Sequence, residues 1–176
     1  MSFLTELPRL IITDIDGVWT DGGMYYDKFD NEFKKFNTGD GAGLIFCRML
    51  GIEVAIITGE NTPIVTRRAE KLKIDHVYLG IQNKLKVAQE LCNNLGISLS
   101  EVAYIGDDIG DISLLREVGC SGAPANAMEY VKKEVNWIGE KKGGDGAFRE
   151  FVEFIISRHH SLEELVNQYV QSTLTL

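Results

Sequence analysis

Two aspartates stand two positions apart at the end of an apolar run near the start of the chain. Leu10 to Thr13 has the length and composition of a buried strand, and Asp14-Ile15-Asp16 follows it, before a glycine-rich turn at Gly17. In an extended chain, residues i and i+2 point to the same face, so both carboxylates can address one substrate atom or one metal ion. An Asp-Gly turn after a strand is also common without any chemistry. The rest of the chain has to decide between these interpretations.

Polar residues also follow two other apolar runs of strand length, 53–57 and 101–105. They are Thr58, Gly59, Asp107, Asp108 and Asp111. Because parallel strands place their carboxyl ends at one edge of a sheet, we expect these residues around one crevice. Four or five carboxylates there would repel one another without a hard cation, and oxygen ligands without His or Cys select Mg²⁺ over zinc. A helix N-cap would explain one of the acids but not the whole set.

Phosphoryl transfer uses this combination of groups. Asp14 can attack phosphorus and form an aspartyl-phosphate, and Asp16 can protonate the leaving alkoxide and later deprotonate a water molecule. Thr58 and neighbouring backbone N–H groups can hold a phosphoryl oxygen, and Lys84, at the start of an expected helix, can supply positive charge. A lysine at the start of a helix is also common on protein surfaces without any function. The assignment of Lys84 to phosphate binding therefore depends on the other motif residues.

Strands and helices alternate along the chain that must position these residues. Strands are expected at 10–13, 53–57, 76–79, 101–105, near Cys120 and at 137–138, and helices at 40–50, 63–73, 84–95, 112–118 and 128–133. The helix after Thr58-Gly59 has Asn61 or Thr62 as its candidate N-cap and Pro63 at its first position. This alternation predicts an α/β fold, an open Rossmann-like parallel sheet with helices on both faces.

We expect a single domain over residues 1–176, with two additions to the sheet. Aromatic-rich runs at 24–26 and 32–36 predict a projecting β-hairpin over about residues 24–36, and a helical tail is expected over about 145–176. The hairpin carries more aromatic surface than should remain in water, so another subunit is its expected cover. The tail has a second apolar stripe at Leu162, Leu165, Val166, Tyr169 and Val170, which is expected to pack against a partner or against the body of the domain. His159 and His160 are expected at a solvated helix end.

Composition narrows the classes of partner. A formal charge of −8 argues against nucleic acid and anionic membranes, which both demand a basic face, but not against a small anionic substrate. Met1 to Pro8 lacks the features of a secretory signal, and no segment is long enough to span a bilayer. Cys47, Cys92 and Cys120 are odd in number, widely spaced and in apolar surroundings, which predicts reduced core thiols of a cytoplasmic protein.

The motifs resemble the four motifs of the haloacid dehalogenase (HAD) superfamily of phosphatases. The matching segments, in order, are Asp14 to Gly22, Thr58-Gly59, Lys84 and Gly106 to Asp111. Segments 24–27, 35–43 and 143–150 are similar to the small branch without a cap domain that acts on 3-deoxy-2-ulosonic (sialic-acid-like) sugar acid phosphates. The resemblance covers about residues 8–155.

This resemblance implies roles for individual residues. Asp14 would be the nucleophile and Asp16 the general acid/base, with Thr58 and Lys84 binding the phosphate. Mg²⁺ would be ligated by Asp14, the Asp16 carbonyl and Asp107, with Asp108 and Asp111 in support. The resemblance also implies a homotetramer in which a neighbouring subunit closes the site.

One departure from the branch's pattern concerns the substrate. In enzymes that act on 3-deoxy-D-manno-octulosonate (KDO) 8-phosphate, Arg usually follows Thr-Gly, whereas Glu60 stands here. Glu60 and Lys71, with Trp19 and Asn37-Thr38, are more similar to phosphatases of 2-keto-3-deoxynonulosonate (KDN) 9-phosphate. We therefore expect KDN 9-phosphate, with KDO 8-phosphate of lipopolysaccharide biosynthesis as the alternative. A solvated surface pair is the other interpretation of Glu60 and Lys71.

The substrate contacts expected beyond the phosphate are polar. Arg68, from this subunit or a neighbour, is the candidate for the sugar carboxylate because its geometry is bidentate. The expected substrate-binding residues are Thr38, Gly59, Glu60, Arg68 and Lys71.

Two other protein classes share parts of this pattern. A response-regulator receiver also gathers acids, a Thr and a Lys around Mg²⁺, but it lacks an acid two residues after the phosphorylated Asp, so Asp16 argues against it. A dinucleotide-binding module requires G-x-G-x-x-G after the first strand, and the chain has none there.

Overall fold

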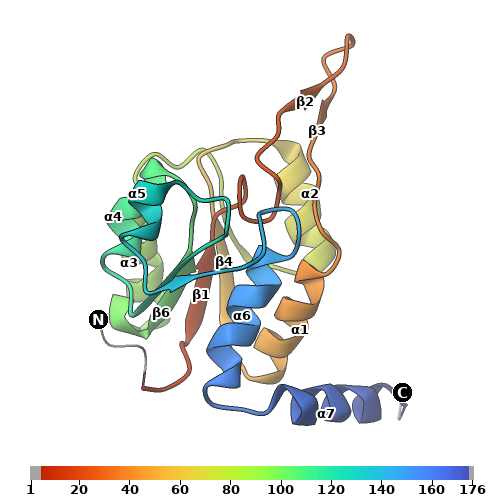
Figure 1. The fold of residues 1–176 in the computed structure, drawn as a ribbon, viewed down its shortest axis with the longest axis vertical. Coiled ribbons are helices and arrows are strands. Elements are labelled where there is room, and N and C mark those ends of the chain that lie inside the picture. The colour runs from red at the N-terminus through yellow and green to blue at the C-terminus, as the bar shows by residue number, and fades with distance from the viewer. Residues whose placement is uncertain (1–4, 175–176) are drawn as a thin grey trace.

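A computed structural model of the protein describes residues 5–174 (Figure 1). Its main sheet has six strands, all parallel, in the order β5-β4-β1-β6-β7-β8. The strands are β1 (Leu10–Thr13), β4 (Glu53–Ile57), β5 (His76–Tyr78), β6 (Val102–Ile105), β7 (Cys120–Ala123) and β8 (Trp137–Ile138). β1 lies between β4 and β6, and Ile12 is opposite both Ala55 and Tyr104. The predicted open α/β fold is confirmed.

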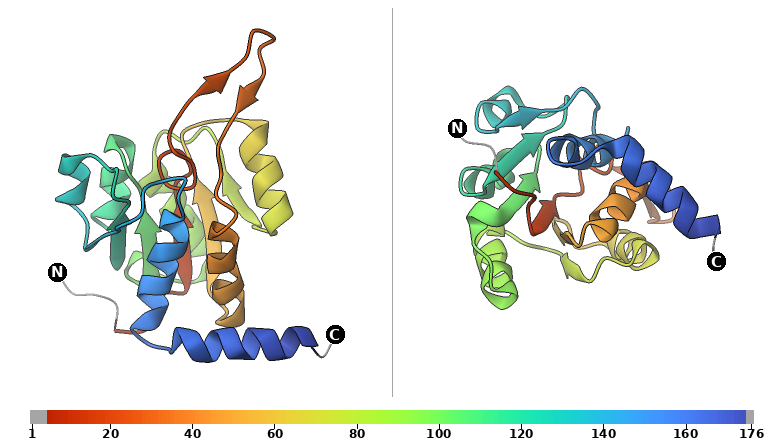
Figure 2. Two further views of the ribbon diagram at one scale, coloured as in Figure 1. Left: turned by 45° about the vertical axis from the view of Figure 1, so that its right-hand side comes forward. Right: turned by 90° about the horizontal axis from the view of Figure 1, so that it is seen from below.

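Helices cover both faces of the sheet. They are α1 (Asp40–Met49), α2 (Pro63–Leu72), α3 (Lys84–Leu95), α4 (Ile112–Leu115), α5 (Glu129–Lys132), α6 (Ala147–Ser157) and α7 (Leu162–Leu174), with short 3₁₀ turns η1 (Leu99–Glu101) and η2 (Ile109–Asp111). One group of helices lies on each face (Figure 2). Successive side chains of β1 point to opposite faces, so Ile11 packs with α1, α2 and α6, whereas Leu10 and Ile12 pack with α3, α4 and α5.

Most predicted boundaries differ from the structure by a residue or two. The helix expected at 112–118 is shorter, since α4 ends at Leu115 and the amide of Gly119 donates to the carbonyl of Leu99. Thr62 occupies the N-cap of α2, but its side chain makes no capping hydrogen bond. Its hydroxyl donates instead to Glu32 of the hairpin at 3.0 Å.

The hairpin rises beyond the carboxyl ends of the sheet strands (Figure 1). Its paired strands, β2 (Tyr25–Tyr26) and β3 (Glu32–Phe33), are shorter than predicted, and an antiparallel bridge between Thr20 and Phe36 closes its base. The large side chains exposed on it are Met24, Tyr25, Tyr26, Phe29 and Phe33. An apolar surface therefore stands above the edge of the sheet where the acidic motifs end.

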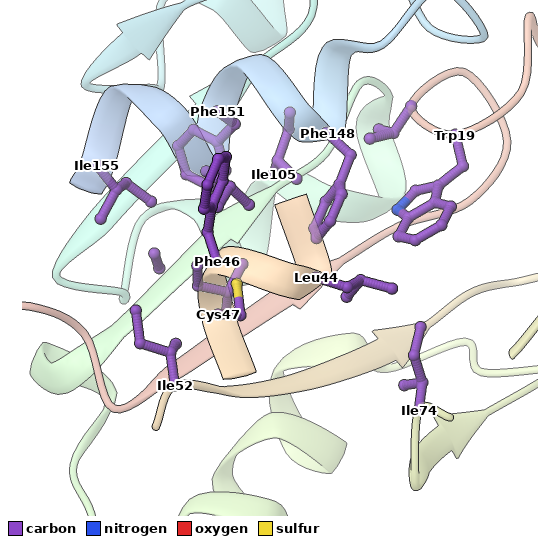
Figure 3. Close-up of a cluster of buried hydrophobic side chains, with 14 of the residues drawn as sticks. Trp19, Leu44, Phe46, Cys47, Ile52, Ile74, Ile105, Phe148, Phe151 and Ile155 are labelled. Carbon is purple, nitrogen blue, oxygen red and sulfur yellow. The ribbon is translucent and has the colours of Figure 1, made fainter. Parts of the chain in front are cut away.

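The core on the α1 and α6 side reaches the loop that follows β1 (Figure 3). The Trp19 ring lies 4.5 Å from the Phe148 ring of α6, measured between centroids, and its indole N–H donates to the Thr13 hydroxyl at 2.9 Å. All three cysteines are buried and unpaired, as predicted. Burial raises the pKa of Cys47 to about 12, which suits an inert core thiol.

The tail contains α6 and α7. Leu165 of α7 is buried against the core, while Val166, Tyr169 and Val170 are exposed, and His159 and His160 are exposed just after α6. Within residues 5–174, no helix has the length and apolar character required to cross a membrane.

Candidate active site

A crevice of about 370 Å³ opens at the carboxyl ends of β1, β4, β5 and β6. The predicted site residues that line it are Asp14, Asp16, Thr58, Gly59, Glu60, Lys84, Asp107, Asp108 and Asp111. They come from four separate segments of sequence, and the parallel sheet brings them together because each follows a strand at the same edge.

Lys84 joins two of the acidic motifs. Its ammonium group lies 2.9 Å from Asp14 Oδ2 and 2.6 Å from Asp111 Oδ1, and all three side chains are buried. Asn83 caps α3 through a hydrogen bond from the Lys86 amide, which fixes Lys84 at the first position of the helix. Burial alone lowers the pKa of Lys84, but the carboxylates of Asp14 and Asp111 outweigh it, so the pKa lies above its ordinary value. Lys84 is therefore a fixed cation beside Asp14.

Asp111 organises the loop after β6. Its Oδ1 accepts from Lys84 and from the Tyr104 hydroxyl at 2.5 Å, and its Oδ2 accepts from the amides of Asp107 and Asp108 at 2.8 and 3.0 Å. Both oxygens are thus occupied by protein donors.

Asp14 and Asp107 differ from Asp111 in their hydrogen bonding. Among the described residues, Asp14 Oδ1 and Asp107 Oδ1 are buried and have no hydrogen-bond partner. Burial, followed by the charge of Asp111, raises the pKa of Asp14 to about 6, and burial with the charges of Asp14, Asp111 and Asp108 raises that of Asp107 to about 8. Buried carboxylate oxygens without donors are costly unless a cation balances them.

Carboxylate oxygens of Asp14, Asp107 and Asp111 lie within 4.8 Å of one another. Since Asp111 already accepts four hydrogen bonds, the two unpartnered oxygens of Asp14 and Asp107 are the better cation ligands. An all-oxygen donor set of this kind fits Mg²⁺.

The loop after β1 approaches the acidic loop so closely that only glycine fits at position 17. Gly17 has a φ of +83°, and a Cβ atom there would overlap the Asp107 carboxylate. From the other side, Asn126 donates to the Gly17 carbonyl at 3.3 Å and accepts from the Gly143 amide at 2.6 Å, and the Gly144 amide donates to the Val18 carbonyl. The segment before α6 therefore braces the loop that carries Asp14 and Asp16.

Asp16 lies at the rim of the crevice with 24% of its side chain exposed. Its Oδ1 accepts from the Thr20 hydroxyl at 3.0 Å, and the Lys34 ammonium contacts Oδ1 and Oδ2 at 2.7 and 2.8 Å. Asp14 and Asp16 thus have different partners, with Lys84 beside Asp14 and Lys34 beside Asp16.

Comparisons with known proteins identify the family. A model of the haloacid dehalogenase-like hydrolases matches residues 80–151. The 3-deoxy-D-manno-octulosonate 8-phosphate phosphatase KdsC of Escherichia coli is 37% identical over 162 residues, which cover 92% of this chain and 86% of that protein. The chain belongs to the haloacid dehalogenase superfamily.

Two solved HAD phosphatases have the same fold. The KDO 8-phosphate phosphatase of Moraxella catarrhalis, in complex with a magnesium ion, a phosphate ion and KDO, has a TM-score of 0.88 and 36% identity, with 92% of this chain and 93% of that chain covered. The cobalt-bound enzyme of Haemophilus influenzae has a TM-score of 0.81 and 37% identity, with 85% and 88% covered.

Three residues expected at the substrate site of this HAD phosphatase do not line the crevice of its own chain. Arg68 packs over the Phe36 ring and donates to the Asn37 carbonyl at 3.1 Å, Lys71 is exposed in the last turn of α2, and Thr38 is exposed before α1. The helix α2 begins at the crevice and runs away from it, so at 1.5 Å per residue Lys71 lies about 12 Å from its first residue. A contact between these residues and a substrate would require a neighbouring subunit, and it stays a prediction.

Sequence reasoning missed several residues of the HAD site. Ile81 and Gln82 line the crevice, Tyr104 binds Asp111, and Lys34 binds Asp16. Ile81 and Gln82 lie between an expected strand and the helix that begins with Lys84, and this position could have predicted that they line the crevice. Tyr104 lies within a strand, where a tyrosine indicates only packing. Lys34 lies in the hairpin, where a lysine indicates only a solvated surface.

Proposed function

We propose that the protein is a Mg²⁺-dependent phosphomonoesterase that hydrolyses KDO 8-phosphate through an aspartyl-phosphate on Asp14. The observation that carries this proposal is the environment of Asp14, with Lys84 on one carboxylate oxygen and the other oxygen unpartnered. The 37% identity to phosphatases named for KDO 8-phosphate supports the substrate.

The proposed Mg²⁺ ligands are Asp14, the main-chain carbonyl of Asp16, and Asp107. The unpartnered oxygens of Asp14 and Asp107 fit this cation, while Asp108 and Asp111 support the loop that carries Asp107. When bound, Mg²⁺ reduces the negative charge of the phosphate, which would otherwise repel the anionic nucleophile.

Asp14 and Asp16 divide the chemistry of the first half-reaction. An oxygen of the Asp14 carboxylate forms a bond to phosphorus while the bond from phosphorus to the ester oxygen breaks. The proton of the Asp16 carboxyl group passes to that ester oxygen, which leaves as an alcohol.

Hydrolysis of the aspartyl-phosphate completes the cycle. Asp16, now ionised, takes a proton from a water molecule whose oxygen attacks phosphorus, and the bond from phosphorus to the Asp14 oxygen breaks. Phosphate leaves, and both aspartates regain their starting states. Thr58, Gly59 and Lys84 line the crevice and hold the phosphoryl oxygens in this proposal.

The choice between KDO 8-phosphate and KDN 9-phosphate depends on Glu60 and Lys71. Glu60 lines the crevice, whereas Lys71 does not, and among the ion pairs of residues 5–174 none joins the two. The pair that favoured KDN 9-phosphate in the sequence is thus not assembled within one chain. Together with the named relatives, this supports KDO 8-phosphate over our sequence-based preference.

Turnover of both sugar phosphates with Mg²⁺ tests the substrate assignment. We expect a higher kcat/KM for KDO 8-phosphate, and little change in the ratio of the two kcat/KM values in Glu60→Arg. Glu70→Arg, on an exposed position of α2, is the matched control. The opposite result would be a higher kcat/KM for KDN 9-phosphate, with a ratio of the two kcat/KM values that Glu60→Arg reduces or reverses and Glu70→Arg leaves unchanged. That result would make KDN 9-phosphate the substrate.

A receiver-type phosphorylation switch is the remaining alternative function. It would form a stable aspartyl-phosphate from a small phosphodonor and show no turnover. Rapid release of inorganic phosphate from p-nitrophenyl phosphate would exclude it.

A homotetramer is the assembly that we propose. The exposed aromatic side chains of the hairpin support this, because a monomer would leave them in water above an open crevice. Light scattering at micromolar concentration tests it, and a monomer would contradict it. The expected cytoplasmic location stays a prediction.

A further inference from the structure

Lys34 is buried against the side chain that is proposed as the general acid/base. Its ammonium group contacts both Asp16 oxygens, at 2.7 and 2.8 Å, and 0% of its side chain is exposed. Asp16 lines the crevice and Lys34 does not, so Lys34 approaches the carboxyl group from the protein side. Lys34 is therefore placed to act through Asp16 rather than directly on a substrate.

Lys34 has a second acidic neighbour, which is itself held by α2. Glu32 of β3 lies 3.7 Å from the Lys34 ammonium, and its other oxygen accepts from the hydroxyl of Thr62, a buried residue at the N-cap of α2. On the far side, Thr20 donates to Asp16. A continuous polar chain thus runs from α2 through the returning strand of the hairpin to Asp16.

We infer that Lys34 is a positioning residue that holds the Asp16 carboxyl group toward the leaving group. A carboxyl group at the rim of an open crevice would otherwise sample several side-chain rotamers, and Lys34 and Thr20 together fix one of them. This inference rests on the proposed function, since it concerns the transfer of the Asp16 proton to the ester oxygen as the bond to phosphorus breaks.

The inference is tested with Lys34→Met, which keeps the length of the side chain and removes its charge. Lys35→Met is the matched control, because Lys35 is the next residue and pairs with exposed Asp145 at 3.1 Å, away from Asp16. The measured quantity is kcat/KM, which covers the steps up to release of the alcohol. Two substrates are compared: a phosphorylated primary alcohol, whose oxygen needs a proton, and p-nitrophenyl phosphate, whose phenolate leaves without one.

We expect Lys34→Met to lower kcat/KM for the alkyl phosphate roughly tenfold more than for the aryl phosphate, a part of the ~10²–10⁴-fold that a placed acid contributes. Lys35→Met should leave both values near wild type. Equal losses on both substrates would show a merely structural role, and no loss on either would show no role. Both results would overturn the inference.

A second variant keeps the test decisive if Lys34→Met fails to fold. Glu32→Gln retains Lys34 and an acceptor for Thr62 but removes the charge that holds the ammonium group. Glu32→Gln should lower kcat/KM for the alkyl phosphate more than for the aryl phosphate. Equal reductions of kcat/KM for the two substrates would refute the inference. The two proposals can fail separately. If the wild-type enzyme hydrolyses another alkyl phosphate but not KDO 8-phosphate, the proposed substrate is refuted. The comparison of alkyl and aryl leaving groups would still decide the role of Lys34.

Discussion

Metal-free protein is expected to lose stability as the pH rises from 6 to 8, because Asp107 must ionise among other carboxylates. Burial, and then the charges of Asp14, Asp111 and Asp108, raise the pKa of Asp107 from 3.8 to about 8. The unfolded chain keeps the ordinary value. Since the folded state binds the proton more tightly, this stabilising contribution is complete below the unfolded pKa and is lost as the pH rises through the folded pKa.

The size of the effect follows from this pKa difference. One group in this range changes the free energy of unfolding by about 1.4 kcal/mol per pH unit, so two pH units below about 8 remove roughly 2.5 kcal/mol. At about 2–4 °C of Tm per kcal/mol for a chain of this length, Tm should fall by about 5–10 °C. Asp14, with a pKa of about 6, contributes mainly below this window.

Thermal unfolding in EDTA at pH 6, 7 and 8 measures the effect. Asp107→Asn is the control, and it should remove most of the fall because the amide does not titrate. Saturating Mg²⁺ should raise Tm more at pH 8 than at pH 6, since the cation competes with protons for the same oxygens. A wild-type Tm that stays constant from pH 6 to 8, or an equal fall in Asp107→Asn, would refute the reasoning.

Three further predictions concern the reaction and its metal. Asp14→Asn should abolish turnover without unfolding the protein, because an amide forms no aspartyl-phosphate and ligates Mg²⁺ poorly. Near-normal phosphate release by the folded variant would refute the covalent mechanism. Asp16→Ala should lose ~10²-fold or more in kcat/KM for an alkyl phosphate and less for p-nitrophenyl phosphate, and equal losses would exclude acid catalysis. Gly17→Ala should weaken Mg²⁺ binding in calorimetry, since its Cβ would displace the Asp107 carboxylate, and wild-type affinity would contradict that close approach.

The central part of the fold could be predicted from the sequence because its signals are local. Gly51 and Gly59 flank the run at 53–57, Asn83 and Gly96 bound the helix at 84–95, and the structure has both elements over the predicted residues. The convergence of Asp14, Thr58, Lys84 and Asp107 also followed, because a parallel sheet places the ends of its strands at one edge.

What could not be predicted depends on how elements are oriented in space. Lys34 lies in a short hairpin whose pattern does not indicate which side chains turn toward the sheet. Asn61 or Thr62 was expected to cap α2, and Thr62 does stand at the N-cap, but its hydroxyl donates to Glu32, thirty residues earlier in sequence, rather than capping the helix. Arg68 packs on Phe36 in this chain, a contact that the sequence did not predict because the direction of α2 is set by packing rather than by its own sequence, and its expected contact with a substrate across a subunit interface stays a prediction.

The brace between Gly17 and the segment before α6 has a consequence for the order in which the protein becomes active. Asn126 and Phe148 contact the loop after β1, and Gly143 lies against the Gly17 carbonyl, although all three are more than a hundred residues later in sequence. During synthesis from the N-terminus, β1 through β6 are available before these partners. We therefore expect a nascent or truncated chain that ends before residue 143 to be catalytically silent, even where its sheet has begun to pair.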